Sequence, residues 1–208
     1  MQTIEYFYSA HSAYAYIGSK LLMDVAMDGG RRIDHRPMDL RAVVAATGPG
    51  PHNSRTEQRR AYFSGREIER WAEARDVEIL SWPTFHDNEI ALSNGMLIAG
   101  LLQGHDIDML AHRLLEGHWR DDADLADMAT LERLGMEAGI DDPAPLLDAA
   151  RSPEVMAVYN ANTTEAIQRS VFGSPTYFVD GDMFYGQDHL ELVAQALSKP
   201  FKGKWPRG

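Results

Sequence analysis

The hydrophobic residues change their spacing twice in the first forty positions of the chain. Apolar and polar residues alternate over Thr3–Tyr8, which is rich in aromatic side chains and predicts a half-buried or central strand. From Ser12 the apolar spacing becomes helical, until Gly29-Gly30 supplies a stop. Residues 32–38 alternate again and run on into residues 39–40 as a second strand. The chain is therefore predicted to begin with a β-α-β unit.

The central part of the sequence has the spacing of helices. The run Gly48-Pro49-Gly50-Pro51 cannot hold regular structure, because proline lacks a donor and glycine favours turns. After it, residues 56–170 have helical spacing with almost no strand signal, and further helices are predicted over residues 109–116, 125–138 and 154–171. We expect an all-helical insertion.

The last part of the chain returns to strand patterns. Residues 176–179 and 183–185 are strand-like, and Asp180-Gly181 between them is a strong two-residue hairpin signal. A closing helix follows over residues 188–197, and the short basic tail over residues 199–207 is expected to fray. The order β-α-β, helices, β-β-α predicts a discontinuous α/β domain of residues 1–45 and 170–208, with a helical domain of residues 46–169 inserted.

The amino-acid composition excludes several classes of function. The chain of 208 residues has no cysteine, which excludes internal disulfides, a redox dithiol, cysteine nucleophiles and thiolate zinc sites. The net charge of -11 repels nucleic acids and anionic membranes, and no apolar run approaches the roughly 20 residues of a membrane span. Without a leader-like start, we expect a cytoplasmic protein. The eight histidines form no i, i+4 pair, so no metal site is predicted.

Four arginines lie close together in the middle of this acidic sequence. They are local cations that would suit a small anion, although a solvated helix face is the simpler interpretation: Arg55, Arg59, Arg60 and Arg66.

Ser12 lies at the predicted corner between the first strand and the first helix. Unpaired backbone N–H groups and the positive end of the helix dipole converge there, and they stabilise anions, including thiolates. Serine is also a preferred N-cap, and that structural role alone would explain its presence. His11 would accept a thiol proton or pair with a substrate carboxylate, or lie idle in solvent. Tyr14 would supply a second hydroxyl, or pack in the core.

A second feature is Gly173-Ser174-Pro175-Thr176, just before the late hairpin. A proline that opens a strand is usually a trans structural stop, although some are cis and functional. Together with the Ser12 corner and the inserted helices, this stretch resembles the 2-hydroxychromene-2-carboxylate isomerases and kappa-class glutathione transferases. Both belong to the disulfide oxidoreductase branch of the thioredoxin superfamily. The resemblance extends from Ile4 to about Leu197, and it implies a thioredoxin-like fold.

The resemblance also implies roles for individual residues. Ser12 replaces the redox cysteine of the superfamily and faces Pro175, which would be cis, while the backbone of Ser174 pairs with glutathione. Asn53 lies near the pocket, and Gln187-Asp188 meet the γ-glutamyl end of glutathione, although Asp188 is also a suitable helix cap. The sequence departs from the family at Ala13, where proline is usual, and at Ser174, where an apolar residue is usual.

The activity implied is a glutathione-dependent cis-trans isomerisation of a 2-hydroxychromene-2-carboxylate-like intermediate of aromatic degradation. The Ser12 hydroxyl would donate to the glutathione sulfur and raise its thiolate fraction, which is only a few per cent for a thiol of pKa ~8.5 at neutral pH. Glutathione would be the cofactor, a small aromatic molecule the substrate, and a homodimer the assembly. The alternatives are a kappa-like transferase or peroxidase, and a non-catalytic binding protein that keeps the fold.

Overall fold

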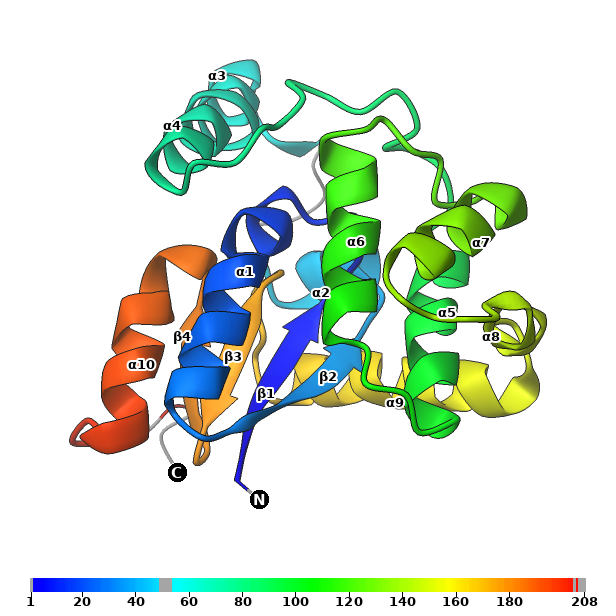
Figure 1. Ribbon diagram of the computed structural model, residues 1–208. Coiled ribbons are helices and arrows are strands. Elements are labelled where there is room, and N and C mark those ends of the chain that lie inside the picture. Colours follow the sequence, from blue (N-terminus) through cyan, green and yellow to red (C-terminus); the bar gives the residue numbers. More distant parts are fainter. Residues whose placement is uncertain (1, 49–53, 204, 206–208) are drawn as a thin grey trace.

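Four strands form one mixed sheet at the centre of the computed structural model (Figure 1). The structure describes residues 2–48, 54–203 and 205. The sheet order is β2-β1-β3-β4, with β2 parallel to β1, and β3 antiparallel to both of its neighbours. The strands are β1 (Thr3–Tyr8), β2 (Arg32–Pro37), β3 (Thr176–Val179) and β4 (Asp182–Tyr185). The predicted β-α-β and β-β-α units thus join in one sheet, which confirms the thioredoxin-like fold.

The alternation in the strands separates two apolar layers. Tyr6 and Tyr177 lie on the face covered by α1 (Ala13–Asp28) and α10 (Leu190–Ser198), with ring centroids 5.5 Å apart. Phe7 and Phe178 belong to the opposite layer, which α2 (Leu40–Ala46) and α9 (Pro153–Gln168) cover. Both faces of the sheet are therefore buried, as expected of a strand order that includes a parallel crossover.

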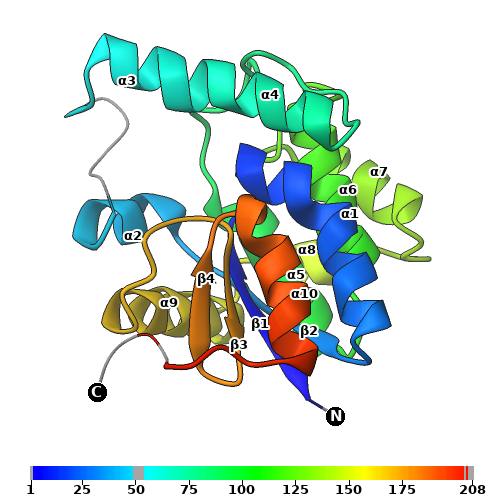
Figure 2. The ribbon, with the colours of Figure 1, turned by 90° about the vertical axis from the view of Figure 1, so that its left-hand side faces the viewer.

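Helices fill the chain between β2 and β3, and the described residues there contain no strand. Their core is continuous with that of the sheet through α1. Figure 2 shows α3 and α4 lying across one end of the molecule, above α1 and α2; we call residues 57–74, which include a π-helical turn over Tyr62–Arg66, the arm. The helices are α3 (Glu57–Ala61), α4 (Glu67–Ala74), α5 (Ala91–Leu102), α6 (Asp108–Trp119), α7 (Met128–Glu137) and α8 (Ala144–Ala149).

Several predicted boundaries are wrong, and capping explains two of them. The second strand ends at Pro37 and does not run into residues 39–40, because the Asp39 side chain accepts from Ala42 N and starts α2. In the same way Asp127 accepts from Thr130 N, so α7 begins at Met128 and not at residue 125. The closing helix is preceded by a separate 3-10 turn, Gln187–His189.

Two expectations about irregular segments also need correction. Residues 75–90 hold no regular helix, although the spacing predicted one, and the segment is tied down by hydrogen bonds such as Leu80 N to the Trp119 carbonyl. The tail was expected to fray, but two of its described residues contact the second hairpin strand. Trp205 N donates to the Asp182 carboxylate, and the rings of Phe201 and Phe184 are 6.0 Å apart. Among the described residues, no helix is both long and apolar enough to cross a bilayer.

Candidate active site

Ser12 lies at the strand-to-helix corner, as predicted, and its hydroxyl makes two hydrogen bonds. It accepts from Ala15 N at 3.2 Å, which makes Ser12 the N-cap of α1, and it donates to the Ser174 carbonyl oxygen at 3.0 Å. The side chain is nearly buried, with 6% of the residue exposed. The first turn of α1 contains no acidic residue, so no carboxylate within that turn offsets the positive end of the helix dipole. The corner therefore offers a hydroxyl proton and a positive potential at one point.

The peptide bond between Ser174 and Pro175 is cis, which confirms the prediction made from the resemblance. The Ser174 hydroxyl accepts from Ser9 N at 3.2 Å, so the polar side chain at this position connects the loop before β3 to the end of β1. Ser12, Ser174 and Pro175 are thus brought together, although they lie at opposite ends of the sequence.

A cleft of about 470 Å³ opens beside this corner, between the arm and the sheet domain. Tyr14 is in its wall, with its hydroxyl donating to the Phe63 carbonyl at 2.6 Å, and burial raises the Tyr14 pKa well above its usual value. The cleft combines aromatic rings with cations, and its lining includes Phe63, Phe172, Tyr185, Arg55 and Arg59. Two of the four clustered arginines therefore face a pocket.

The other arginines of that cluster have different partners. Arg66 forms an ion pair with Glu69 at 3.2 Å on the exposed surface of the arm, as the solvated-face interpretation predicts. Arg60 donates to the Arg55 carbonyl at 2.5 Å.

Gln187 and Asp188 differ in their surroundings. Gln187 is buried, its Oε1 accepts from Arg75 Nε at 3.2 Å, and its Nε2 has no partner among the described residues. The Asp188 side chain is 47% exposed. Burial raises the pKa of the Tyr14 and Tyr185 phenols, and the negative charge of the nearby Asp188 adds to both shifts. Asp188 therefore faces the region of the cleft, whereas Gln187 is held inside. Asn53 lies outside the described residues.

His11 does not line the cleft. Its ring packs against His118 and His86, with centroids 4.8 and 6.5 Å away, and only 4% of the residue is exposed. Burial lowers its pKa well below the usual value, and the nearby His118, His86 and Arg41 add to the effect. His11 is therefore buried and neutral, neither solvated nor a strong proton acceptor. No group of three His, Cys, Asp or Glu in the described part of the chain has the arrangement of a metal site.

Sequence analysis missed the residues that hold the corner from the helical side. Asn94 in α5 and Trp119 in α6 are both buried and both bond to the backbone of residues 9–12. For Asn94 a signal was available, because it is a lone amide in the apolar run of α5. A buried amide of this kind almost always has specific partners.

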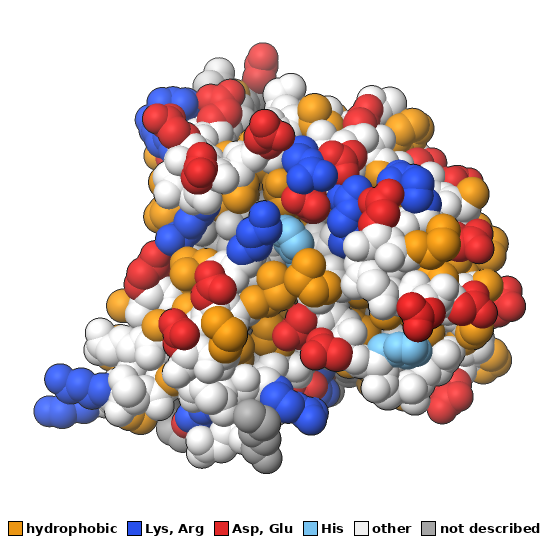
Figure 3. Space-filling model, viewed as in Figure 1, with side chains coloured by type: hydrophobic (Ala, Val, Ile, Leu, Met, Phe, Trp, Pro, Cys, Tyr) orange, Lys and Arg blue, Asp and Glu red, His pale blue; other side chains and the backbone are white. Residues whose placement is uncertain are grey.

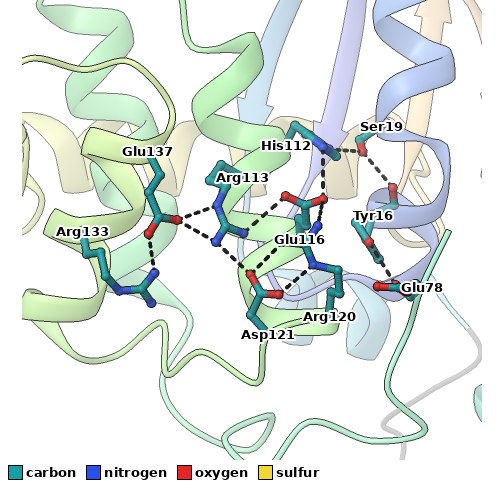
Figure 4. Close-up of polar contacts among 10 residues, drawn as sticks. All are labelled: Tyr16, Ser19, Glu78, His112, Arg113, Glu116, Arg120, Asp121, Arg133 and Glu137. Carbon is teal, nitrogen blue, oxygen red and sulfur yellow. Dashed lines mark hydrogen bonds and ion pairs between the residues drawn. The ribbon is translucent and has the colours of Figure 1, made fainter.

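A second polar network fixes α1 against α6 (Figure 4). The Ser19 hydroxyl donates to the Tyr16 carbonyl at 2.7 Å, and His112 Nδ1 lies 2.7 Å from the same hydroxyl oxygen. Because that hydroxyl has only one proton, His112 Nδ1 is the donor in the second contact. His112 Nε2 then faces Glu116 at 3.9 Å, and Glu116 pairs with Arg120 at 2.5 Å. The helix that carries Ser12 is thus anchored along its length.

Charged side chains of both signs lie close together on the surface of the protein. Figure 3 shows acidic and basic side chains interspersed over the face of the molecule that it views. The cations in the wall of the cleft are therefore compatible with the acidic composition.

Residues 3–198 match the family model of the DSBA-like thioredoxin domain. The chain belongs to this family. A 2-hydroxychromene-2-carboxylate isomerase from Sphingobium xenophagum is 30% identical over 202 residues, which cover 94% of this chain and 98% of that protein. A protein of the same name from Pseudomonas sp. (strain C18) is 26% identical, over 93% of this chain and 89% of its own length. The predicted relationship to these isomerases is confirmed.

Solved structures agree on the fold. A structure of 2-hydroxychromene-2-carboxylate isomerase superposes with a TM-score of 0.78 at 22% identity, covering 95% of each chain. The cytosolic disulfide reductase DsbM from Pseudomonas aeruginosa, solved with GSH, superposes with a TM-score of 0.63 at 16% identity, covering 95% of this chain and 93% of DsbM.

Proposed function

We propose that this protein is a glutathione-dependent cis-trans isomerase acting on a 2-hydroxychromene-2-carboxylate-like intermediate of aromatic degradation. The observation that carries the proposal is the Ser12 hydroxyl at the start of α1, facing the carbonyl that precedes cis-Pro175, in a chain without cysteine. A corner that stabilises a thiolate but holds no thiol needs its sulfur from a bound partner. The full-length similarity to isomerases supports the reaction class.

The groups around the corner fit glutathione, a tripeptide thiol with one ammonium and two carboxylates. The exposed Asp188 carboxylate suits the ammonium, and the guanidinium groups of Arg55 and Arg59 suit a carboxylate. The unpartnered Nε2 of Gln187 is a buried donor in the same region of the chain. We assign glutathione to Ser12, Ser174, Pro175, Gln187 and Asp188, with Asn53 assigned from the resemblance.

When bound, glutathione supplies a thiolate that adds reversibly to a conjugated double bond and permits rotation about it. Ser12 would turn its proton from the Ser174 carbonyl to the sulfur. The N–H groups of Ala13 and Tyr14, which a helix start leaves without partners inside the helix, add to the positive potential. Both effects favour the thiolate over the thiol.

The aromatic walls and the cations of the cleft suit an aromatic acid as substrate. Phe63 and Phe172 offer apolar surfaces, and the Arg59 guanidinium lies 5.6 Å from the centroid of the Phe63 ring. Tyr14 is proposed as an accessory residue of the wall. His11 is buried and lies outside the cleft lining, so it is proposed as an accessory residue of the corner that neither contacts the substrate nor removes the thiol proton.

The test follows the ultraviolet spectrum of 2-hydroxychromene-2-carboxylate with the enzyme, with and without glutathione. We expect conversion only when glutathione is present, and binding of the protein to immobilised glutathione. Ser12→Ala should lose most of the turnover. Ser93→Ala, which alters another buried serine whose hydroxyl donates to the Ile90 carbonyl at 3.5 Å, should keep it.

Each other outcome would assign a different function to this protein. Equal conversion without glutathione excludes the thiol mechanism. Glutathione binding without isomerisation, but with conjugation or peroxide reduction, identifies a kappa-like transferase or peroxidase. Absence of both glutathione binding and conversion identifies a non-catalytic member of the fold.

We further propose that the protein forms a homodimer, as the resemblance implies, and that it acts in the cytoplasm. The exposed aromatic rings of Tyr62 and Phe63 on the arm are compatible with a partner surface. Light scattering at micromolar concentration tests the dimer, and fractionation of the source cells tests the compartment.

A further inference from the structure

The corner that carries Ser12 is held by the amide of one buried asparagine. Asn94 Oδ1 accepts from Ala10 N at 3.0 Å, and its Nδ2 donates to Ser9 Oγ at 3.1 Å and to the Ile90 carbonyl at 2.8 Å. The residue is fully buried in α5. One amide thus fixes two consecutive residues of the corner to a helix that is distant in the sequence.

Ser9 passes this restraint on to both sides of the candidate site. Its N–H donates to Ser174 Oγ at 3.2 Å, and its carbonyl accepts from Ser12 N at 3.0 Å. The chain of bonds from Asn94 through Ser9 therefore reaches both members of the pair Ser12 and Ser174, whose own contact is 3.0 Å long. A shift of Ser9 would change the two positions together.

A second side chain from the helical layer, Trp119, holds the backbone of His11, the residue directly before Ser12. Trp119 Nε1 donates to the His11 carbonyl at 3.0 Å, and the indole is buried at the end of α6. Residues 9, 10, 11 and 12 of the corner each have a hydrogen bond to a group outside the corner, and the helical layer provides those to residues 9, 10 and 11.

These contacts are not needed to build α5 itself. An apolar residue at position 94 would suit the surrounding helix, which is buried over most of its length. Such an apolar residue would leave the buried N–H of Ala10 without a hydrogen-bond acceptor, which costs free energy. Satisfied polar networks in a core fix one geometry more strictly than apolar packing does. The side-chain amide of Asn94 therefore fixes the backbone geometry of the corner and is not required for α5.

We propose that Asn94 and Trp119 are positioning residues, which set the placement of Ser12 against Ser174 and through it the stabilisation of a bound thiolate. This inference rests on the proposed function. Neither side chain touches the sulfur, and both act through the backbone of residues 9–12. The activity of the sheet domain would then depend on the helical layer packed beside it.

The experiment compares Asn94→Ala, Ser9→Ala and Trp119→Phe with the wild-type protein. Asn162→Ala is the matched control, because Asn162 is another buried asparagine that donates to a backbone carbonyl, that of Pro37 in β2, and its amide makes no hydrogen bond to residues 9–12. The measurements are the pKa of the enzyme-bound glutathione thiol, from thiolate ultraviolet absorbance against pH, together with kcat and KM for the chromene carboxylate. Thermal unfolding shows which variants are folded.

We expect the bound thiol pKa of the three variants to move up toward the value of about 8.5 of a free thiol. Their kcat should fall about 10- to 100-fold, because small misplacements of reacting groups are costly, with little change in KM. The control should keep the wild-type thiol pKa. If Asn94→Ala does not fold, Ser9→Ala and Trp119→Phe decide the question, because the first removes one hydroxyl and the second removes the indole N–H but keeps a buried aromatic ring.

An unchanged thiol pKa and kcat in folded variants that bind glutathione would overturn the positioning role and leave the proposed function in place. Equal changes in the Asn162→Ala control would also overturn it, because the effect would then be one of general stability. If wild-type protein binds no glutathione, the proposed function fails, and the positioning role fails with it.

Discussion

The Ser12 hydroxyl donates to the Ser174 carbonyl oxygen at 3.0 Å, across 162 positions of sequence. This bond joins the N-terminus of α1 to the loop that leads into β3. It is a bond between neutral groups, so a thiolate that takes its place would receive a stronger, charge-assisted one. The exchange gives the corner a preference for the anionic form of a ligand.

Ser12→Ala removes both the cap of α1 and the proton facing Ser174. We expect the fold to survive with a loss of about 1 kcal/mol in the free energy of unfolding, as for other N-cap substitutions. Glutathione-dependent turnover should fall about 100-fold, as when one donor to a developing anion is removed. Urea unfolding and steady-state kinetics measure the two effects. A variant with normal turnover would reduce Ser12 to a helix cap.

Tyr14→Phe removes the bond from the Tyr14 hydroxyl to the Phe63 carbonyl, which closes the arm over α1 at 2.6 Å. We expect faster amide hydrogen exchange in the arm and a KM several-fold higher, with kcat nearly unchanged, since the phenol is part of a wall. Tyr16→Phe is the control, because its hydroxyl makes a similar bond to the Glu78 carbonyl at 3.0 Å outside the cleft lining. Equal effects in the two variants would contradict a specific role for Tyr14.

Arg59→Gln removes a cation from the cleft wall. Hydrogen bonds to charged groups contribute about 1.5–3 kcal/mol, so KM for the aromatic acid or glutathione should rise about tenfold or more. The difference from wild type should shrink at high salt, because screening weakens the attraction in both. Arg66→Gln, on the same arm but paired with Glu69, should leave KM unchanged. A salt-independent KM in wild type would argue against charge recognition here.

The free energy of unfolding should decrease as the pH falls through the range where histidine titrates. Burial lowers the pKa of His11, His112 and His118 in the folded state. Because the pKa is lower in the folded state, the unfolded chain binds more protons as the pH falls. The contribution of each neutral histidine to the free energy of unfolding is therefore complete above the unfolded-state pKa of about 6.5. It is lost as the pH falls toward the folded-state pKa. The maximum slope is about 1.4 kcal/mol per pH unit for each histidine.

Urea unfolding at pH 7.5 and pH 5.5 measures this dependence. His112→Gln should reduce the difference between the two pH values, because it removes one of the three titrating groups. Substitution of His105, which is exposed, should not. A difference that is unchanged in His112→Gln would assign the pH dependence to other groups.

Much of the fold could be predicted from the sequence, since its signals are local. The alternation over Thr3–Tyr8 and the Asp180-Gly181 hairpin gave the right strands, because period and turn chemistry depend on neighbouring residues. The error at residues 39–40 has the opposite cause. Asp39 caps α2 with its side chain, which overrides the continued strand pattern.

The candidate site likewise contains residues that could be predicted from the sequence and residues that could not. Ser12 and Pro175 were found because their local motifs match a family. Asn94 and Trp119 were not found, because their partners lie 84 and 108 residues away. The apolar run around Asn94 marks its amide as unusual, but no local pattern identifies the partner of either residue. The environment of His11 was also missed, because burial against His118 depends on how α6 packs on the corner.

The C-terminal tail has a practical consequence for handling the protein. Trp205 bonds to Asp182 through its backbone, and its ring lies 6.4 Å from that of Phe172, which is in the cleft wall. A purification tag fused at the C-terminus would follow Trp205 after only three further residues of the sequence. Kinetic work is better done with an N-terminal tag or with the tag removed, because a C-terminal tag would change the measured affinities without any change in the catalytic corner.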